Sequence, residues 1–406
     1  MPAQILPADS ILETAVTWGE FEKHIRSALK TDAKLGSSKS VVNIGDGAGL
    51  ASFCALITCD WICADKDEEL PKKVILKIPS VLPMRRMSEA VPKEERVFDS
   101  EEGWSYMAQQ INKAHNIEIA AYHFFGQFSH LALPKMFYAF RSEKGSEYHG
   151  QLCMEFVENT TMMSYTEAHP LKQLKQIARA LGKLQAASLN EEPTSPEFND
   201  DIFGDFASII PKESYCAAFK PLLQFDSSPR MVKAIEDIEK ILPDYYGSTL
   251  PATIHKQMNY RPVLISGDLA AFIDWQCTRH GVAVEDLLRI QLFGQLPQER
   301  RDSRKGLLAE MYNSMLADLD DASAVPYTLE EMDELYDLLM PHCGLYAAFL
   351  MPNMMKANLA MPGISDEERE KFRTVQMDKV LGILEDIVAY DDLNKKSAHK
   401  LTFITD

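Results

Sequence analysis

Two aspartates in the second half of the chain are the residues best suited to chemistry. Asp268 follows the apolar residues 263–265, and Asp274 follows the apolar residues 271–273. Such runs are typical of strands that each deliver one carboxylate to a turn, the arrangement that a phosphotransferase uses for a catalytic base and a metal-binding aspartate. In an active enzyme of that kind, a longer loop with an Asn for a second magnesium ion separates the two. Here only residues 269–273 lie between them, and none is Asn.

The same segment also has a purely structural interpretation. Residues 263–265 and 271–273 could pair as a hairpin, because Gly267 and Asp268 are ordinary turn residues. Asp268 would then cap a turn and Asp274 would begin a loop, with neither carboxylate bound to metal. The segment taken alone favours neither interpretation, so the rest of the chain has to decide.

A glycine run near the start of the chain is the first feature that favours a phosphate site. Gly45, Gly47 and Gly49 follow one apolar run and precede another. Glycine has no Cβ to block a close approach, so this backbone could lie over a phosphate chain. A Gly-rich hairpin turn gives the same pattern, and the run is therefore a weak signal by itself.

A lysine inside an apolar strand is the second such feature. Lys77 lies within the run 74–78, where a buried charge is costly unless it is paired; the alternative is an edge lysine that faces solvent. Glu118, on the helical pattern of residues 105–125, is the predicted partner, because kinases join such a lysine to a helix glutamate to position the α and β phosphates. Without the lysine, Glu118 would be one more solvated helix carboxylate. The ordered set of glycines, lysine, glutamate and aspartates is more specific than any member.

The periodicity of the sequence changes near residue 158. Before it, strand-like runs surround one helical pattern, and after it helical patterns dominate, with the aspartate segment as the one strand-like part. A chain of 406 residues exceeds the roughly 250–300 at which single cores stop growing, so we expect an N-terminal lobe over residues 1–157 and a C-terminal lobe over 158–406. The strand-like runs are 41–44, 53–58, 74–78, 136–140 and 152–157, and the helical patterns are 105–125, 171–185, 284–296, 329–350 and 372–388.

Composition and charge exclude several classes of partner. The formal net charge of -18 works against binding of nucleic acid or anionic membrane surfaces, because neutralisation of phosphates by Lys and Arg drives most of that affinity. The N-terminus lacks the pattern of a secretory signal, and no segment offers the ~20 uninterrupted apolar residues of a membrane span. The 7 cysteines are scattered and odd in number, which suits reduced thiols. We therefore expect a cytoplasmic protein.

The motif series resembles that of the CHK kinase-like family, also called ecdysteroid kinase-like, whose fold is similar to choline and aminoglycoside kinases. The resemblance covers most of the chain and keeps the order of the family's motifs. It rests on the glycine loop 43–52 (NIGDGAGLAS), the lysine strand 74–79 (VILKIP), the helix motif 115–118 (HNIE) with Tyr122, the hinge strand 152–157 (LCMEFV), the helix-end motif 184–189 (LQAASL), and the aspartate motifs 262–269 (PVLISGDL) and 271–276 (AFIDWQ).

The resemblance implies a fold, cofactors and residue roles. The fold would be α+β and protein-kinase-like, with a small antiparallel sheet in the N-lobe and a mainly helical C-lobe. ATP and Mg²⁺ would be the cofactors, and the acceptor would be the hydroxyl of a small-molecule alcohol. Asp268 would be the catalytic base and Asp274 the metal ligand. The residues implied in nucleotide binding are Gly45, Gly47, Gly49, Lys77, Glu118, Glu155 and Val157.

The chain departs from the family pattern at the catalytic loop. Ser266 replaces the His of the His-Gly-Asp-Leu motif, and the Trp and Asn that follow, with the strand pair before Ile-Asp-Trp-Gln, are absent. One hypothesis is an ATP-dependent phosphotransferase whose turnover the shortened loop lowers. The other is a catalytically inactive kinase-fold protein that binds nucleotide or a partner, or a sequence lacking an exon-sized piece. We expect Lys77 to pair with Glu118, and Asp268 and Asp274 to face one cleft beneath the glycine run.

Overall fold

The chain forms two compact units that are interleaved in sequence. One comprises residues 1–160 and 271–277, and the other residues 161–270 and 278–406. The lobe boundary at residues 157 and 158 stays a prediction. The computed structural model describes residues 6–45, 51–62, 69–89, 100–143, 148–162, 167–200, 202, 205, 211–246, 257–258, 263–266, 268–282, 284–359 and 364–397.

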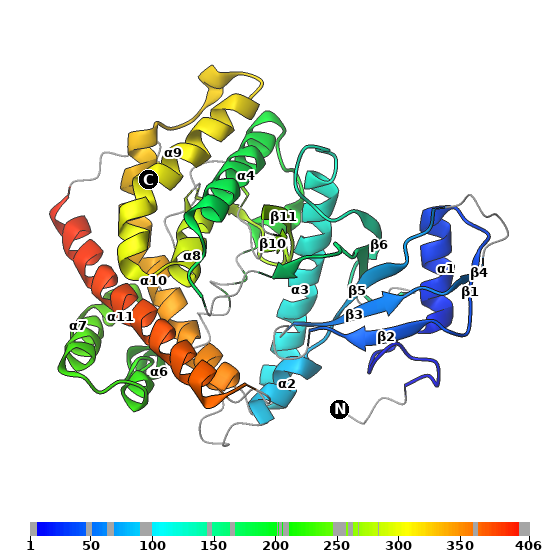
Figure 1. Cartoon of the computed structure of the whole chain (residues 1–406), viewed down its shortest axis with the longest axis horizontal. Helices are drawn as coiled ribbons and strands as arrows, with labels where there is room; N and C mark the ends of the chain where they lie inside the picture. The colour runs from blue at the N-terminus through cyan, green and yellow to red at the C-terminus, as the bar shows by residue number, and fades with distance from the viewer. Residues whose placement is uncertain are drawn as a thin grey trace. The chain divides into compact units, whose positions relative to one another are not determined.

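The first unit contains a five-stranded antiparallel sheet with the order β2-β3-β5-β7-β6. The five strand-like runs of the sequence form these five strands, as predicted. Figure 1 shows them as the adjoining blue to teal arrows. The strands are β2 (Ser40–Asn43), β3 (Ser52–Thr58), β5 (Lys73–Pro79), β6 (Met136–Phe140) and β7 (Gln151–Glu155), and a separate pair is formed by β1 (Lys34–Leu35) and β4 (Trp61–Ile62).

One face of this sheet is covered by α1 (Trp18–Leu29), which the sequence interpretation missed. Phe21 and Ile25 of α1 pack against alternate strand residues such as Ala55 and Leu76. Thr17 caps the helix by accepting the N–H of Glu20. The expectation of a single helix in this half is therefore wrong, since α2 (Leu82–Glu89) is present as well. A short helix such as α1 owes its stability to burial against the sheet, and local periodicity does not report that burial.

The predicted helix of the first half is α3 (Glu101–Phe125), which contacts β5 and β6. Ser100 caps its N-terminus by accepting the N–H of Gly103, and acidic residues in the first turn complement the helix dipole. Its C-terminal half is buried on nearly all sides. A helix of that kind can hold a charged residue such as Glu118 only where a counter-charge is available.

The second unit is mainly helical. All four helical patterns predicted after residue 158 are present, and α4 packs along α9 while α10 packs along α11 (Figure 1). The helices are α4 (Leu171–Asn190), α6 (Lys212–Cys216), α7 (Pro229–Tyr245), α8 (Glu285–Gly294), α9 (Pro297–Asp318), α10 (Leu329–Leu359) and α11 (Asp366–Lys396), with 3₁₀ turns at Pro196–Asn199, Lys220–Gln224 and Ala322–Ala324.

Short strands accompany these helices, so the aspartate segment is not the one strand-like part of the second half. The correction concerns strands of two residues, which are too short to give a periodic signal. They are β8 (Thr161–Met162), β9 (Gln257–Met258) and β12 (His280–Gly281), beside β10 (Val263–Ser266) and β11 (Asp268–Phe272) of the aspartate segment.

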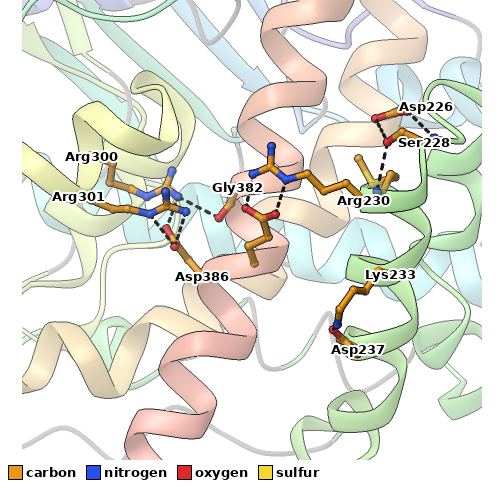
Figure 2. A network of polar contacts seen from close by, with 11 residues as sticks. Asp226, Ser228, Arg230, Lys233, Asp237, Arg300, Arg301, Gly382 and Asp386 are labelled. Atoms are coloured by element: carbon orange, nitrogen blue, oxygen red, sulfur yellow. Dashed lines mark hydrogen bonds and ion pairs between the residues drawn. The ribbon is translucent and has the colours of Figure 1, made fainter.

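Ion pairs tie α11 to its neighbours α9 and α7. Arg300 and Arg301 of α9 both reach Asp386 of α11, at 2.6 and 2.8 Å, and Figure 2 shows the two guanidinium groups converging on this carboxylate. Arg230 of α7 forms a two-pronged contact with Glu385 at 2.6 and 2.7 Å. Because Arg300 and Asp386 are nearly buried, losing either partner would leave an uncompensated charge in the helical core.

Two helical glycines give opposite predictions for stability. A Cβ at Gly182 of α4 would collide with the carbonyl oxygen of Met311 and lie 2.8 Å from the amide nitrogen of Met315, both on α9. Gly306, also helical, has nothing within 4 Å of its Cβ position. We expect Gly182→Ala to cost about 1–3 kcal/mol and Gly306→Ala to add about 0.5–1 kcal/mol in urea unfolding. Equal effects at both positions would contradict the close α4–α9 contact.

The architecture has the predicted α+β class, with a small antiparallel sheet in one unit and mostly helices in the other. Among the described residues, no helix combines the length and the apolar composition that a membrane span requires.

Candidate active site

The pleat of β5 places Lys77 on the sheet face opposite to α1. Val74, Leu76 and Ile78 alternate into the core that α1 covers, so Lys77 points to the other side. Only 6% of the residue is exposed. A buried ammonium group needs counter-charges. The alternation of side chains along β5 therefore predicts acidic groups next to Lys77, on the sheet face opposite to α1.

Two carboxylates meet the Lys77 ammonium group. Its Nζ lies 2.7 Å from Oε2 of Glu118, so the ion pair predicted between these residues is present. The same Nζ donates a hydrogen bond of 2.6 Å to Oδ1 of Asp274. Glu118, on α3, is fully buried. The structure thus brings together three of the predicted site residues.

The turn that carries Asp274 is held in a conformation uncommon for its residue type. Asp274 has φ 62°, in the left-handed region, which Asn and Asp tolerate better than most other non-glycine residues. The next residue, Trp275, is buried, with its ring 4.8 Å from that of Phe125 and 6.5 Å from that of Tyr122. A strained backbone conformation persists only where the surrounding structure holds it in place. Here the buried indole of Trp275 anchors the turn to α3.

Gln276 completes the polar cluster. With its carboxamide oxygen turned toward Lys77, that oxygen accepts from Nζ at 3.0 Å while its nitrogen donates to Oδ1 of Asp274 at 3.3 Å. The lysine and the aspartate are thereby bridged by a neutral side chain. Sequence reasoning did not assign Gln276 a role, although it lies in the AFIDWQ motif; its position directly after the aspartate turn was the available signal.

Charge and burial set the protonation of this cluster. Burial lowers the pKa of Lys77, but the negative charges of Asp274 and Glu118 outweigh it and raise the pKa above the usual range, so the lysine stays charged. Burial raises the pKa of Glu118 above its ordinary value, against the lowering effect of Lys77. Two carboxylates face one ammonium group, and the cluster therefore has a net negative charge whenever both are ionised.

The cluster fits a magnesium ion that completes its coordination with phosphates. Within the described part of the chain, no group of three or more His, Cys, Asp and Glu side chains could hold a metal alone. Magnesium in kinase-type sites is commonly bound through one or two carboxylates plus substrate phosphates and water. Asp274, whose side chain is 39% exposed, suits that pattern, whereas the buried Glu118 does not.

Asp268 lies in the second unit and has different partners. Lys172 and Gln176 of α4 each donate a hydrogen bond of 2.8 Å to its Oδ1. These hydrogen bonds and the positive charge of Lys172 lower the pKa of Asp268. The strand that begins at Asp268, β11, is a hydrogen-bonded neighbour of β10, so two strands of this segment pair as in the structural alternative, but Asp268 lies in a strand and does not cap a turn. Nothing in the sequence linked α4 to this aspartate.

The remaining predicted residues are only partly within the described chain. Gly45 precedes the undescribed residues 46–50, and Gly47 and Gly49 fall among them, so the predicted cleft beneath the glycine run stays a prediction. Glu155 ends β7, where its N–H donates to the carbonyl oxygen of Lys135 at 2.8 Å. Val157 follows it and is half-buried. The nucleotide-binding roles of these residues likewise remain predictions.

Comparisons with known proteins give a family. A family model named DUF1679 and described as "Uncharacterized oxidoreductase dhs-27" matches residues 5–395. No curated protein matches the chain. Among solved structures, a GDP complex of an aminoglycoside 2'-phosphotransferase-IIIa mutant is 11% identical, with 93% of this chain and 98% of that chain covered and a TM-score of 0.39. The GDP and kanamycin complex of APH(2")-IIIa is also 11% identical, with 88% and 97% covered and a TM-score of 0.39.

Those TM-scores are too low to transfer ligands or roles, and the assignment therefore rests on the family match, which spans nearly the whole chain. The chain belongs to the ecdysteroid kinase-like family DUF1679.

Proposed function

We propose that this protein is an ATP-dependent phosphotransferase that acts on the hydroxyl group of a small molecule. The observation that carries the proposal is the buried Lys77 ammonium group with Glu118 at 2.7 Å and Asp274 at 2.6 Å. A lysine and helix glutamate of this kind position the phosphates of ATP, and a nearby aspartate holds magnesium. The other proposed roles are the base for Asp268, phosphate contacts for Gly45, Gly47 and Gly49, and nucleotide contacts for Glu155 and Val157.

The different burial of the two carboxylates supports different roles. Glu118 is fully buried beside Lys77 and serves as its permanent counter-charge. Asp274 is partly exposed, so its carboxylate can exchange the lysine for a metal ion without leaving the ammonium group unpaired. Bound Mg²⁺ would neutralise negative charge that develops on the phosphates. Lys77 would at the same time donate to a phosphate oxygen.

The proposal also covers the bounds of the two lobes, the cellular location and the class of substrate. We place the N-lobe at residues 1–157 and the helical lobe at 158–406, with the aspartate turn of the second half contributing to the nucleotide site. We expect the protein to act in the cytosol on a small-molecule alcohol. We do not propose an oxidoreductase, the word used in the family description, because the five-stranded sheet of this chain is antiparallel throughout, whereas dinucleotide-binding folds use a mostly parallel sheet.

A second candidate function is nucleotide binding without turnover. It is favoured by two observations at the catalytic segment. Residues 269–273 contain no Asn for a second metal ion, and Asp268 is already engaged by Lys172 and Gln176. A carboxylate with a lowered pKa is also a weaker proton acceptor.

A titration with magnesium-ATP tests the proposal. We expect the free energy of unfolding to rise by about 2.7 kcal/mol when free nucleotide reaches about 100 times its Kd, measured by thermal shift. A coupled ADP-release assay over a panel of small alcohols should show slow turnover that disappears in Asp268→Asn. Nucleotide stabilisation without ADP release would favour the second candidate. No stabilisation by nucleotide would exclude both.

A further inference from the structure

Helix α4 presents two side chains to Asp268 from positions one helical turn apart. Lys172 Nζ and Gln176 Nε2 both donate to Oδ1 of Asp268 at 2.8 Å. The Gln176 carboxamide also accepts the backbone N–H of Leu269 at 3.0 Å through Oε1. Gln176 therefore holds both the side chain of Asp268 and the backbone of the residue after it.

This arrangement does more than an exposed ion pair does. The side chains of Lys172 and Asp268 are 74% and 58% exposed, and a pair of that kind contributes little to stability. The carboxamide of Gln176, however, fixes the direction of the carboxylate as well as its position. Both hydrogen bonds go to Oδ1, and no described residue hydrogen-bonds to Oδ2. One carboxylate oxygen is thus held while the other remains able to accept a proton.

We propose that Lys172 and Gln176 are positioning residues for Asp268, and that α4 supplies the support that the shortened segment 269–273 cannot. The inference rests on the proposed function, in which Asp268 is the base that accepts the proton of the acceptor hydroxyl. Phosphoryl transfer depends mainly on positioning and on neutralisation of charge. A residue that fixes the base should therefore affect kcat and leave the binding of ATP unchanged.

The expected effects separate positioning from a general structural role. Gln176→Ala should lower kcat about tenfold with an unchanged KM for ATP, because a loosened base spends less time in the reactive geometry. Lys172→Met should lower kcat by a similar factor, and Lys172→Arg should retain activity because it keeps a charged donor. Lys175→Met is the matched control, since Lys175 lies on the same helix but pairs with Glu310 at 3.4 Å.

The experiment combines steady-state ADP release with hydrogen exchange resolved to single residues. The Leu269 amide should exchange about tenfold faster in Gln176→Ala than in the unmutated protein, a readout that requires no turnover. Tenfold losses of kcat in Gln176→Ala and Lys172→Met, with normal activity in Lys172→Arg and Lys175→Met, would support the inference. If the first two variants match Lys175→Met while ADP release persists, the inference is overturned and the proposed function stands. If the unmutated protein releases no ADP, turnover and the positioning role both fail.

Discussion

Replacing Lys77 by Met should abolish stabilisation by magnesium-ATP and lower the free energy of unfolding by about 3–5 kcal/mol near pH 8. The large effect follows from the burial of Glu118, which would remain in the interior without its counter-charge. Removing the lysine also removes the group proposed to contact the phosphates. Urea unfolding and thermal shift with nucleotide measure the two effects on the same preparation.

The loss of stability should depend on pH with a definite sign. Burial already raises the pKa of Glu118, and the loss of Lys77 removes the interaction that lowers it. The folded variant then binds a proton more tightly than the unfolded chain does. Stability is retained below the ordinary glutamate pKa and is lost as pH rises through the raised folded-state pKa. Lys77→Met should therefore be more destabilised at pH 8 than at pH 5.5.

Two further variants control this prediction. Lys73→Met changes a lysine of the same strand that is exposed and lies over the Phe156 ring at 5.5 Å, so it should cost no more than about 1 kcal/mol. The double variant Lys77→Met with Glu118→Gln removes the buried charge and should recover part of the stability at pH 8, but not the response to nucleotide. Equal stability of Lys77→Met and Lys73→Met at pH 8 would contradict the assignment.

The Lys77–Glu118 pair could be predicted from the sequence because a lysine within a short apolar run is visible locally and the cost of burying it without a counter-charge is large. A lysine in the run 74–78 has to face away from the apolar core, and a buried ammonium group requires an acid. The helix that carries Glu118 is long and periodic enough to be found. In contrast, α1 could not be predicted in this way, since the burial of Phe21 and Ile25 against the sheet is a tertiary effect.

The surroundings of the two aspartates could not be predicted, for different reasons. Asp274 adopts a left-handed conformation because Trp275 is anchored on Phe125, and that packing joins distant parts of the chain. Lys172 and Gln176 are polar residues on a helix surface, where sequence periodicity names no partner. Asp268 was compatible with both a strand-pair turn and a catalytic role, and the structure shows it at the start of a paired strand with its carboxylate held by α4.

Asp274→Asn should remove the magnesium dependence of nucleotide binding and reduce ADP release by about a hundredfold or more. Asparagine is the right substitution because it tolerates the φ of 62°, whereas Ala would add left-handed strain. Lys77 keeps Glu118 as its counter-charge, so the variant should fold. The loss of turnover is of the size found when a single group that stabilises transition-state charge is removed, roughly 3 kcal/mol.

Binding and turnover measured together separate the roles of the two aspartates. In the unmutated protein, the thermal shift with ATP should be larger with magnesium than with EDTA, and in Asp274→Asn the two shifts should be equal. Asp268→Asn is the matched control: the same chemical change six positions earlier in the chain should keep the magnesium-dependent shift and lose ADP release. The thermal-shift measurement identifies the metal ligand even where turnover is slow, because nucleotide binding requires no reaction. A magnesium-dependent shift that survives in Asp274→Asn would exclude Asp274 as the metal ligand, while one that vanishes in Asp268→Asn would place the metal at Asp268 instead.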